Sequence, residues 1–199
     1  MTDGLVLAIA AIGGYLLGSI PFGLVLVKLA GLGDVRQQGS GNIGATNVLR
    51  TGRKDLALAT LVLDAAKAGI AAAIFGWVFG TTAGLVAGGA AFLGHCFPVW
   101  LKFNGGKGVA TFLGVLLVVE FPVGFLVCMT WLGTALLFRI SSLAALVAAA
   151  AAPLLALAFS RPDVALLAVF LDALLYWRHK TNIARLLRGE EPMIGAGKA

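Results

Sequence analysis

Long apolar stretches follow one another through most of this 199-residue chain, and they constrain its fold more than any other feature. A run of about 20 apolar residues is long enough to cross the hydrocarbon core of a bilayer as a helix. Hydrophobic residues make up 60% of the chain and charged residues 12%, about half the charged fraction of an ordinary soluble domain. The sequence therefore predicts an all-α, polytopic integral membrane protein that forms a single domain over residues 1–199.

Seven stretches are candidate transmembrane helices. They cover residues 5–29, 56–79, 83–101, 109–119, 121–138, 143–159 and 164–177. The stretch 109–119 is short for a full span, and around Glu120, Phe121 and Pro122 it can form a bent pair with the stretch that follows. A five-span arrangement therefore stays open beside the seven-span one.

Basic residues are distributed unevenly between the two sides of the seven-span arrangement. All of them except Lys67 and Arg161 fall in alternate loops or in the carboxyl-terminal tail, whereas Arg161 shares the other side with Asp3, Glu120 and Asp163. The positive-inside rule makes the basic side cytoplasmic, with the amino terminus outside and the carboxyl terminus inside. The net charge of +6 then reflects topology and attraction to anionic headgroups, and a nucleic-acid partner is excluded.

The first of three polar segments, 36–54, contains the run SGNIGATNVLR from Ser40 to Arg50. Glycines let a backbone approach a ligand closely, Ser40 and Asn42 add hydrogen-bonding groups, and the planar fork of Arg50 matches a phosphate. A plain surface turn is the alternative. Because helices in a membrane need only a few residues to connect them, a polar loop of this length favours a binding function.

The second segment, 102–108, is rich in glycine and leads directly into the apolar stretch 109–119. Consecutive glycine amides beside Lys107, at the start of a helix, are typical of a phosphate site. The segment is not a Walker A loop, because Gly108 stands where that motif has Ser or Thr. The alternative is a glycine turn whose lysine only marks the membrane interface.

The third segment, 178–191, is a basic tail in which Arg178, Asn182 and Arg185 recur at helical spacing. Such tails often only anchor a protein to lipid headgroups. His179 adds a group that can exchange a proton near neutral pH at the membrane surface.

Polar residues inside the apolar stretches have both structural and functional interpretations. Asp64 and Lys67 are three residues apart and are expected to pair along one helix face. Asp172 can share a helix face with His179 or pair with Lys67, and His95 is expected to be structural. The two cysteines lie within spans without CxxC spacing and are expected to be buried apolar residues. The sequence shows no carboxylate cluster that would demand a metal, so neither a metal nor a cofactor is expected.

The order of the three segments resembles that of the bacterial acyl-phosphate:glycerol-3-phosphate acyltransferases. The resemblance rests on SGNIGATNVLR, on HCFPVWLKFNGGKGVAT from His95 to Thr111, and on HKTNIARLLRGEE from His179 to Glu191. It implies transfer of a fatty acyl group from acyl phosphate to the sn-1 hydroxyl of glycerol 3-phosphate at the bacterial inner membrane, as the first step of phospholipid biosynthesis. It also implies that neither acyl-CoA nor acyl-carrier protein is required.

The resemblance also implies roles for individual residues. One group is expected to bind glycerol 3-phosphate and comprises Ser40, Asn42, Arg50 and Asn182. A second group is expected to bind acyl phosphate and comprises Gly105, Gly106, Lys107, Gly108 and Thr111. His179 is the candidate base, unless a substrate phosphate takes the proton, and Lys107 is expected to stabilise developing charge. A transporter of small anions is the alternative from another class, and it lacks support because the chain shows no repeated half.

Overall fold

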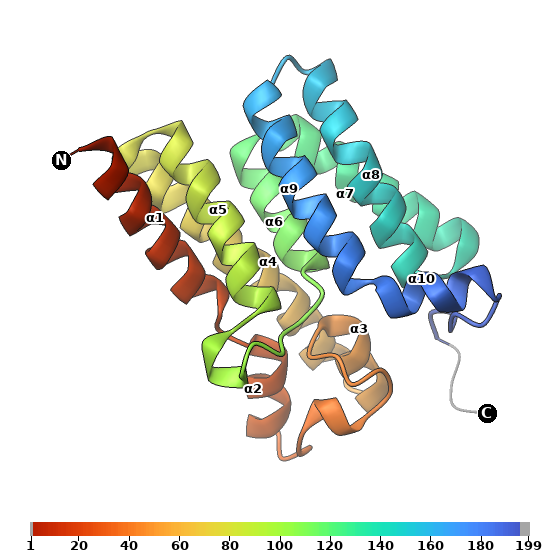
Figure 1. The fold of residues 1–199 in the computed structure, drawn as a ribbon. Helices are drawn as coiled ribbons and strands as arrows, with labels where there is room; N and C mark the ends of the chain where they lie inside the picture. Colours follow the sequence, from red (N-terminus) through yellow and green to blue (C-terminus); the bar gives the residue numbers. More distant parts are fainter. Residues whose placement is uncertain (1, 196–199) are drawn as a thin grey trace. The chain divides into compact units, whose positions relative to one another are not determined.

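The computed structural model of the chain describes residues 2–195, and every regular element within them is a helix (Figure 1). The prediction of an all-α fold is confirmed. The α-helices are, in chain order, α1 Asp3–Gly18, α2 Phe22–Leu29, α3 Ala45–Val48, α4 Lys54–Phe79, α5 Thr81–Cys96, α6 Val109–Val119, α7 Phe121–Phe138, α8 Ser141–Ala158, α9 Pro162–Arg178 and α10 Lys180–Leu187. The contacts divide the chain into two compact units, which are described separately: the first ends at Val119 and the second begins at Glu120.

In the first unit, α1, α4, α5 and α6 pack against one another with close approaches at glycine. Gly14 and Gly18 of α1 lie so near the backbone of Ala87 and Ala91 in α5 that a Cβ on either glycine would overlap it. Gly114 of α6 lies against the backbone of α4 in the same way. Small residues permit this approach between membrane helices, which associate through van der Waals packing.

The first predicted span, 5–29, is divided in the structure by a break at Pro21 between α1 and α2. A break of this kind frees backbone carbonyls, which must find donors at membrane depth. Lys67 Nζ donates to the carbonyl of residue 20 over 2.7 Å, and Trp100 Nε1 donates to that of residue 19 over 2.9 Å. Side chains of α4 and of the loop after α5 therefore satisfy the broken span.

In the second unit, α8 packs on both α7 and α9. Arg161, which precedes α9, forms ion pairs with Asp163 and with Glu120 at the start of the unit. At the opposite end of α8, the backbone N–H of Ile194 donates to the carbonyl of Arg139 over 2.6 Å. The carboxyl-terminal tail therefore returns to the turn between α7 and α8, and α10 lies at that end (Figure 1).

Five segments are long and apolar enough to cross a membrane. They are Asp3–Leu29, Lys54–Phe79, Thr81–Leu101, Phe121–Phe138 and Ser141–Ala158. The helices α6 and α9, with 11 and 17 residues, are shorter. One residue, Glu120, separates α6 from α7, and Pro122 lies in the first turn of α7, so the two stretches form separate helices. The count of seven spans and their orientation stay predictions.

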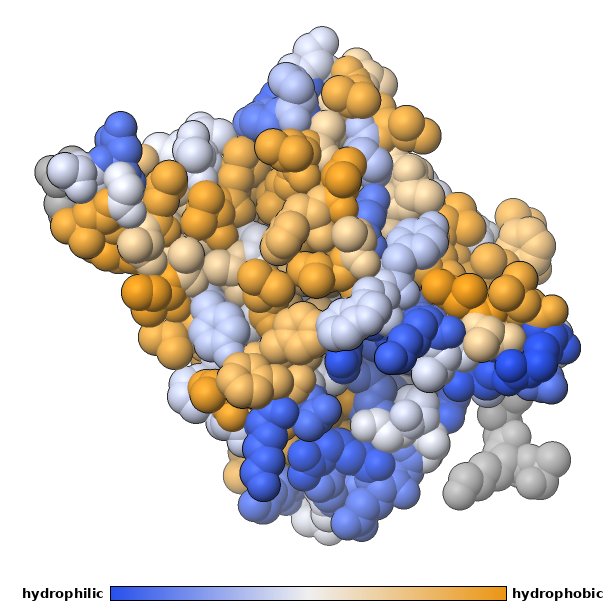
Figure 2. All heavy atoms as spheres, viewed as in Figure 1, coloured by the Kyte–Doolittle hydropathy of each residue, from blue (hydrophilic) through white to orange (hydrophobic). Residues whose placement is uncertain are grey.

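Large apolar side chains are exposed along the helices of both units (Figure 2). Trp77 is 89% exposed and Leu137 is 80% exposed. A soluble protein rarely exposes so much contiguous apolar surface, whereas lipid covers it at no cost. Hydrophilic side chains in Figure 2 gather instead over the segment between α2 and α4, which carries the first polar motif.

Candidate active site

The segment between α2 and α4 is organised around the buried side chain of Asn47, which is 1% exposed. Its Nδ2 donates to the carbonyls of Val35, Gln38 and Asn42 over 2.9, 3.1 and 2.7 Å. Its Oδ1 accepts the backbone N–H of Ser40 over 3.1 Å. One amide thus holds four points of the loop, and Asn42 takes part through its backbone.

Ser40 and Arg50 are brought together by this arrangement, on either side of Gly39. Gly39 has a φ of +53°, and a Cβ there would lie 2.7 Å from Cδ and Nη1 of Arg50. Glycine is therefore required both for the backbone conformation and for the space. Both the hydroxyl-bearing Ser40 and the guanidinium-bearing Arg50 are exposed.

The arginines of this segment differ in whether a carboxylate already neutralises them. Arg36 pairs with Asp34 and Arg53 pairs with Asp55, each over 2.6 Å. Arg50 forms no ion pair within residues 2–195. Its charge is therefore available for an anionic ligand beside Ser40, whereas the other two arginines are balanced.

The first and second polar segments share a small apolar core. Val27, Val35, Ile43 and Val48 are buried in it, and Leu101 packs against it just before the glycine-rich segment. Both segments therefore lie at the same end of the first unit (Figure 1).

The glycine-rich segment packs tightly onto the end of α5. The N–H of Gly105 donates to the carbonyl of Cys96 over 3.1 Å, and that of Gly106 donates to His95 over 3.0 Å. A Cβ on Gly105 would overlap the His95 carbonyl, and one on Gly106 would overlap the His95 ring. Gly108 has a φ of +84° and faces the ring of Phe92. These glycines therefore have a packing role that the sequence did not reveal.

The amides better suited to a phosphate lie at the end of this segment and in the first turn of α6. Because Gly105 and Gly106 donate to α5, the amides of Gly108 and of the first turn of α6 are better suited, since the first N–H groups of a helix lack partners within it. Thr111 lies in this turn, is fully buried, and its Oγ1 has no hydrogen-bond partner within residues 2–195.

Comparison with known proteins covers nearly the whole chain. Residues 8–189 match the family model described as glycerol-3-phosphate acyltransferase. The chain belongs to this family. Proteins named glycerol-3-phosphate acyltransferase from Maricaulis maris and Rhodospirillum rubrum are 69% and 61% identical to it, over 100% of the chain and 92% and 95% of their own lengths.

Two crystal structures of PlsY, an integral membrane glycerol 3-phosphate acyltransferase, have the same fold as this member of the family. The glycerol 3-phosphate form has a TM-score of 0.90 and 42% identity, and it covers 95% of this chain and 96% of its own. The lysophosphatidic acid form has a TM-score of 0.88 and 41% identity, with 95% of each chain covered. With its five long apolar segments, the chain is an integral membrane protein like these relatives.

The second unit of this acyltransferase contains the candidate base. His179 lies between α9 and α10, is 2% exposed, and its Nδ1 is 2.8 Å from the carbonyl of Leu175. A carbonyl can only accept, so Nδ1 carries the proton and Nε2 is the basic nitrogen of the neutral ring. The ring is thus oriented and set in the tautomer that a general base needs.

Asn182 and Arg185 converge on Glu191, the last residue of the third polar segment. Glu191 Oε1 accepts from Asn182 Nδ2 over 2.5 Å and from Ser142 Oγ over 2.7 Å, and Oε2 accepts from Arg185 over 2.7 Å. Burial alone would raise the pKa of Glu191, but these hydrogen bonds outweigh it and lower the pKa below its ordinary value. The cluster ties α10 and the tail to the start of α8.

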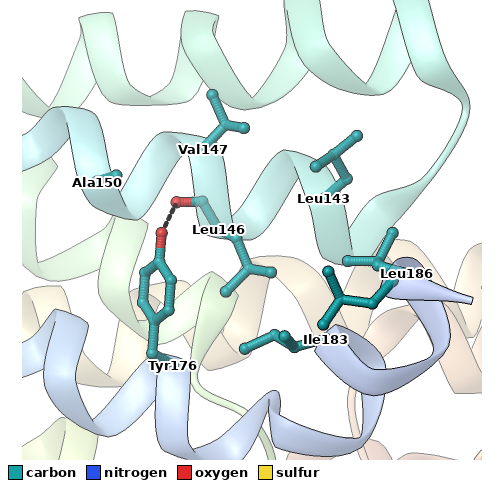
Figure 3. Close-up of a pocket in the computed structure, with 8 residues that line it drawn as sticks. Leu143, Leu146, Val147, Ala150, Tyr176, Ile183 and Leu186 are labelled. Atoms are coloured by element: carbon teal, nitrogen blue, oxygen red, sulfur yellow. Dashed lines mark hydrogen bonds between the residues drawn. The ribbon is translucent and has the colours of Figure 1, made fainter.

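The apolar face of the amphipathic α10 forms one wall of an apolar groove of about 500 Å³ within the second unit (Figure 3). The groove lies between α8, α9 and α10, and Tyr176 Oη donates to the carbonyl of Leu146 beside it over 3.0 Å. Its lining includes Leu143, Leu146, Val147, Tyr176, Ile183 and Leu186. Ile183 and Leu186 of α10 therefore face the groove, while Asn182 on the same helix donates to Glu191.

The polar residues expected inside the spans are also placed. Lys67 Nζ lies 2.7 Å from Asp64 Oδ1, which confirms the predicted pair. Asp172 Oδ1 has no hydrogen-bond partner in the part of the chain that the structure describes. No group of three or more His, Cys, Asp or Glu side chains is arranged to hold a metal ion in that part.

Proposed function

We propose that the chain transfers a fatty acyl group from acyl phosphate to the sn-1 hydroxyl of glycerol 3-phosphate, giving lysophosphatidic acid and phosphate. Family membership supports the acceptor. The observation that carries the proposal is the exposed guanidinium of Arg50, which no carboxylate of residues 2–195 neutralises, lying beside Ser40 in a loop fixed by Asn47. A guanidinium and a hydroxyl in this arrangement suit a phosphomonoester.

The proposal assigns the glycerol 3-phosphate phosphate to Arg50 and Ser40, with Asn42 and Asn182 as further hydrogen-bonding groups. Asn182 also donates its Nδ2 to Glu191 over 2.5 Å.

The proposal assigns the acyl phosphate to Lys107, Gly108 and the first turn of α6, where Thr111 can donate its hydroxyl proton. Gly105 and Gly106 support this site by holding the segment against α5.

The reaction needs little activation, because acyl phosphate is a mixed anhydride. The sn-1 oxygen attacks the carbonyl carbon, a C–O bond forms, and the bond from that carbon to the phosphate oxygen breaks as phosphate leaves with the electron pair. The hydroxyl proton goes to Nε2 of His179 or to a phosphate oxygen of the substrate. Lys107 and backbone amides stabilise the transient oxyanion. No covalent enzyme intermediate, metal or cofactor enters this scheme.

The proposed location is the bacterial inner membrane, with seven crossings and the segments 36–54, 102–108 and 178–191 on the cytoplasmic side. The distribution of lysine and arginine supports this orientation. Acyl phosphate and glycerol 3-phosphate then meet at the membrane surface, and residues 1–199 act as one acyltransferase domain.

The test uses purified protein in detergent with labelled glycerol 3-phosphate and, in separate reactions, palmitoyl phosphate, palmitoyl-CoA and palmitoyl-acyl-carrier protein. We expect labelled 1-acylglycerol 3-phosphate only with palmitoyl phosphate, together with one phosphate released per product. Equal turnover with palmitoyl-CoA would overturn the donor assignment. Uptake of glycerol 3-phosphate into proteoliposomes without any acylated product would favour the transporter alternative.

A further inference from the structure

A buried cluster of three charged or titratable side chains lies beside the break between α1 and α2, outside the assigned substrate contacts. Asp64, Lys67 and His95 are each at most 5% exposed. Lys67 Nζ lies 2.7 Å from the carbonyl of Ile20, 2.7 Å from Asp64 Oδ1 and 2.9 Å from His95 Nδ1. An ammonium has three N–H donors, and these three acceptors use all of them.

The three donors of Lys67 determine which nitrogen of the His95 ring carries the proton. Because the ammonium can only donate, His95 Nδ1 must accept, so the proton of the neutral ring resides on Nε2. Asp64 lies 3.6 Å from the same Nδ1 and balances the lysine charge at the shorter distance of 2.7 Å. The carboxylate of Asp64 balances the charge of Lys67, and the other two acceptors are neutral. The cluster is therefore balanced with a neutral His95.

The other edge of the imidazole meets the glycine-rich segment. His95 Nε2 lies only 2.0 Å from the position that a Cβ of Gly106 would take, and the His95 carbonyl accepts the N–H of Gly106 over 3.0 Å. His95 thus contacts one residue of the segment with both its ring and its backbone. Lys107 follows directly, so a shift of Gly106 moves Lys107 and the start of α6.

We propose that His95 is a positioning residue for the binding of acyl phosphate. The Lys67–Asp64 pair orients the imidazole so that its Nε2–H edge lies against Gly106. This edge holds the Gly105–Gly108 segment in its binding conformation. The inference rests on the proposed function for its substrate. It differs from a purely structural role, in which His95 only supplies an acceptor to Lys67.

Two amide substitutions separate these roles because each keeps one edge of the imidazole. His95→Asn places an oxygen near the Nδ1 position and keeps an acceptor for Lys67, but it leaves nothing against Gly106. His95→Gln places an N–H₂ near the Nε2 position and keeps the contact with Gly106, but it removes the acceptor. The positioning role predicts that His95→Asn raises the KM for palmitoyl phosphate about 10-fold or more, whereas His95→Gln stays within a few fold of wild type. Both variants should keep the wild-type KM for glycerol 3-phosphate.

The purely structural role predicts the opposite order. His95→Gln, which leaves a buried ammonium one acceptor short, would then lose more thermal stability and more activity than His95→Asn. A larger loss of stability and activity in His95→Gln than in His95→Asn would overturn the inference. An equal rise of the KM for both substrates in the two variants would overturn it as well. Turnover of palmitoyl phosphate by the wild-type protein tests the proposed function separately. If the protein uses another acyl donor, the KM values of the two variants are compared for that donor.

A double-mutant cycle checks the contact itself. Gly106→Ala should raise the KM for palmitoyl phosphate in the wild-type background, because its Cβ overlaps the His95 ring. The same change should cost less in the His95→Asn background, where the overlapping atoms are gone. Gly133→Ala in α7 is the matched control, since a Cβ there meets no atom within 4 Å. Additive effects of Gly106→Ala and His95→Asn would contradict the contact.

Discussion

Asn47→Asp should disable the first polar segment while leaving the long apolar helices intact. The substitution keeps the size of the side chain but replaces an amide nitrogen that donates to three carbonyls at 2.7–3.1 Å with an oxygen that repels them. Two lost N–H donors cost about 1 kcal/mol each, and a further 1 kcal/mol or so comes from leaving buried carbonyls unsatisfied, for a total of about 3 kcal/mol. This corresponds to a change of about 100-fold in the equilibrium between ordered and open loop.

The expected result is a rise of roughly 10-fold or more in the KM for glycerol 3-phosphate, because only the ordered fraction of the loop binds it. The KM for acyl phosphate and the melting temperature should change much less, since the membrane helices do not depend on Asn47. Asp34→Asn is the matched control: it makes the converse acid-to-amide exchange in the same loop, at an exposed ion pair with Arg36 that contributes at most about 1 kcal/mol. A KM for glycerol 3-phosphate within twofold of wild type in Asn47→Asp would refute the role assigned to this side chain.

Three further predictions concern stability, phosphate contacts and topology. Because the folded protein lowers the pKa of Glu191 below its ordinary 4.5, the stability that Glu191→Gln removes should be largest above pH 4.5 and should shrink as pH falls through the folded-state pKa; melting curves of both proteins, from neutral pH down to well below pH 4.5, measure it. Arg50→Lys should raise the KM for glycerol 3-phosphate and Lys107→Arg that for acyl phosphate, each by about 10- to 150-fold, and wild-type kinetics in both variants would show that these residues only mark topology. Single cysteines placed in the three polar segments of a cysteine-free variant should resist an impermeant thiol reagent in intact cells, and labelling from outside would contradict the orientation.

Hydropathy predicts most of the helices because the bilayer requires each spanning segment to satisfy its own backbone. The stretches 109–119 and 121–138 have the same bounds as α6 and α7, and 56–79 falls within two residues of α4. The break at Pro21 was missed, since the residues around it remain apolar and the donors that satisfy it come from distant positions, Lys67 and Trp100.

The sequence predicted several residues of the candidate site, but it did not predict the contacts that those residues make. Ser40 and Arg50 were singled out from composition, and the structure brings them together. The structural role of Asn47 was missed because an asparagine in a polar loop does not reveal from the sequence which carbonyls it binds. Gly105 and Gly106 were interpreted as phosphate ligands, but their amides donate to the end of α5, a pairing that depends on how the chain folds back.

The break between α1 and α2 has a consequence for the order in which the protein matures. This span leaves the ribosome before Lys67 and Trp100, which donate to the carbonyls of Ile20 and Ser19. Within the span, the carbonyl of Ile20 also accepts the N–H of Phe22. Lys67 is synthesised only with the second long helix and Trp100 only after the third, so the first span is completed by chain made later. Until then it is exposed to membrane proteases and chaperones. A chain truncated before Trp100 should therefore be degraded faster than one truncated just after α6, as pulse-chase labelling would show.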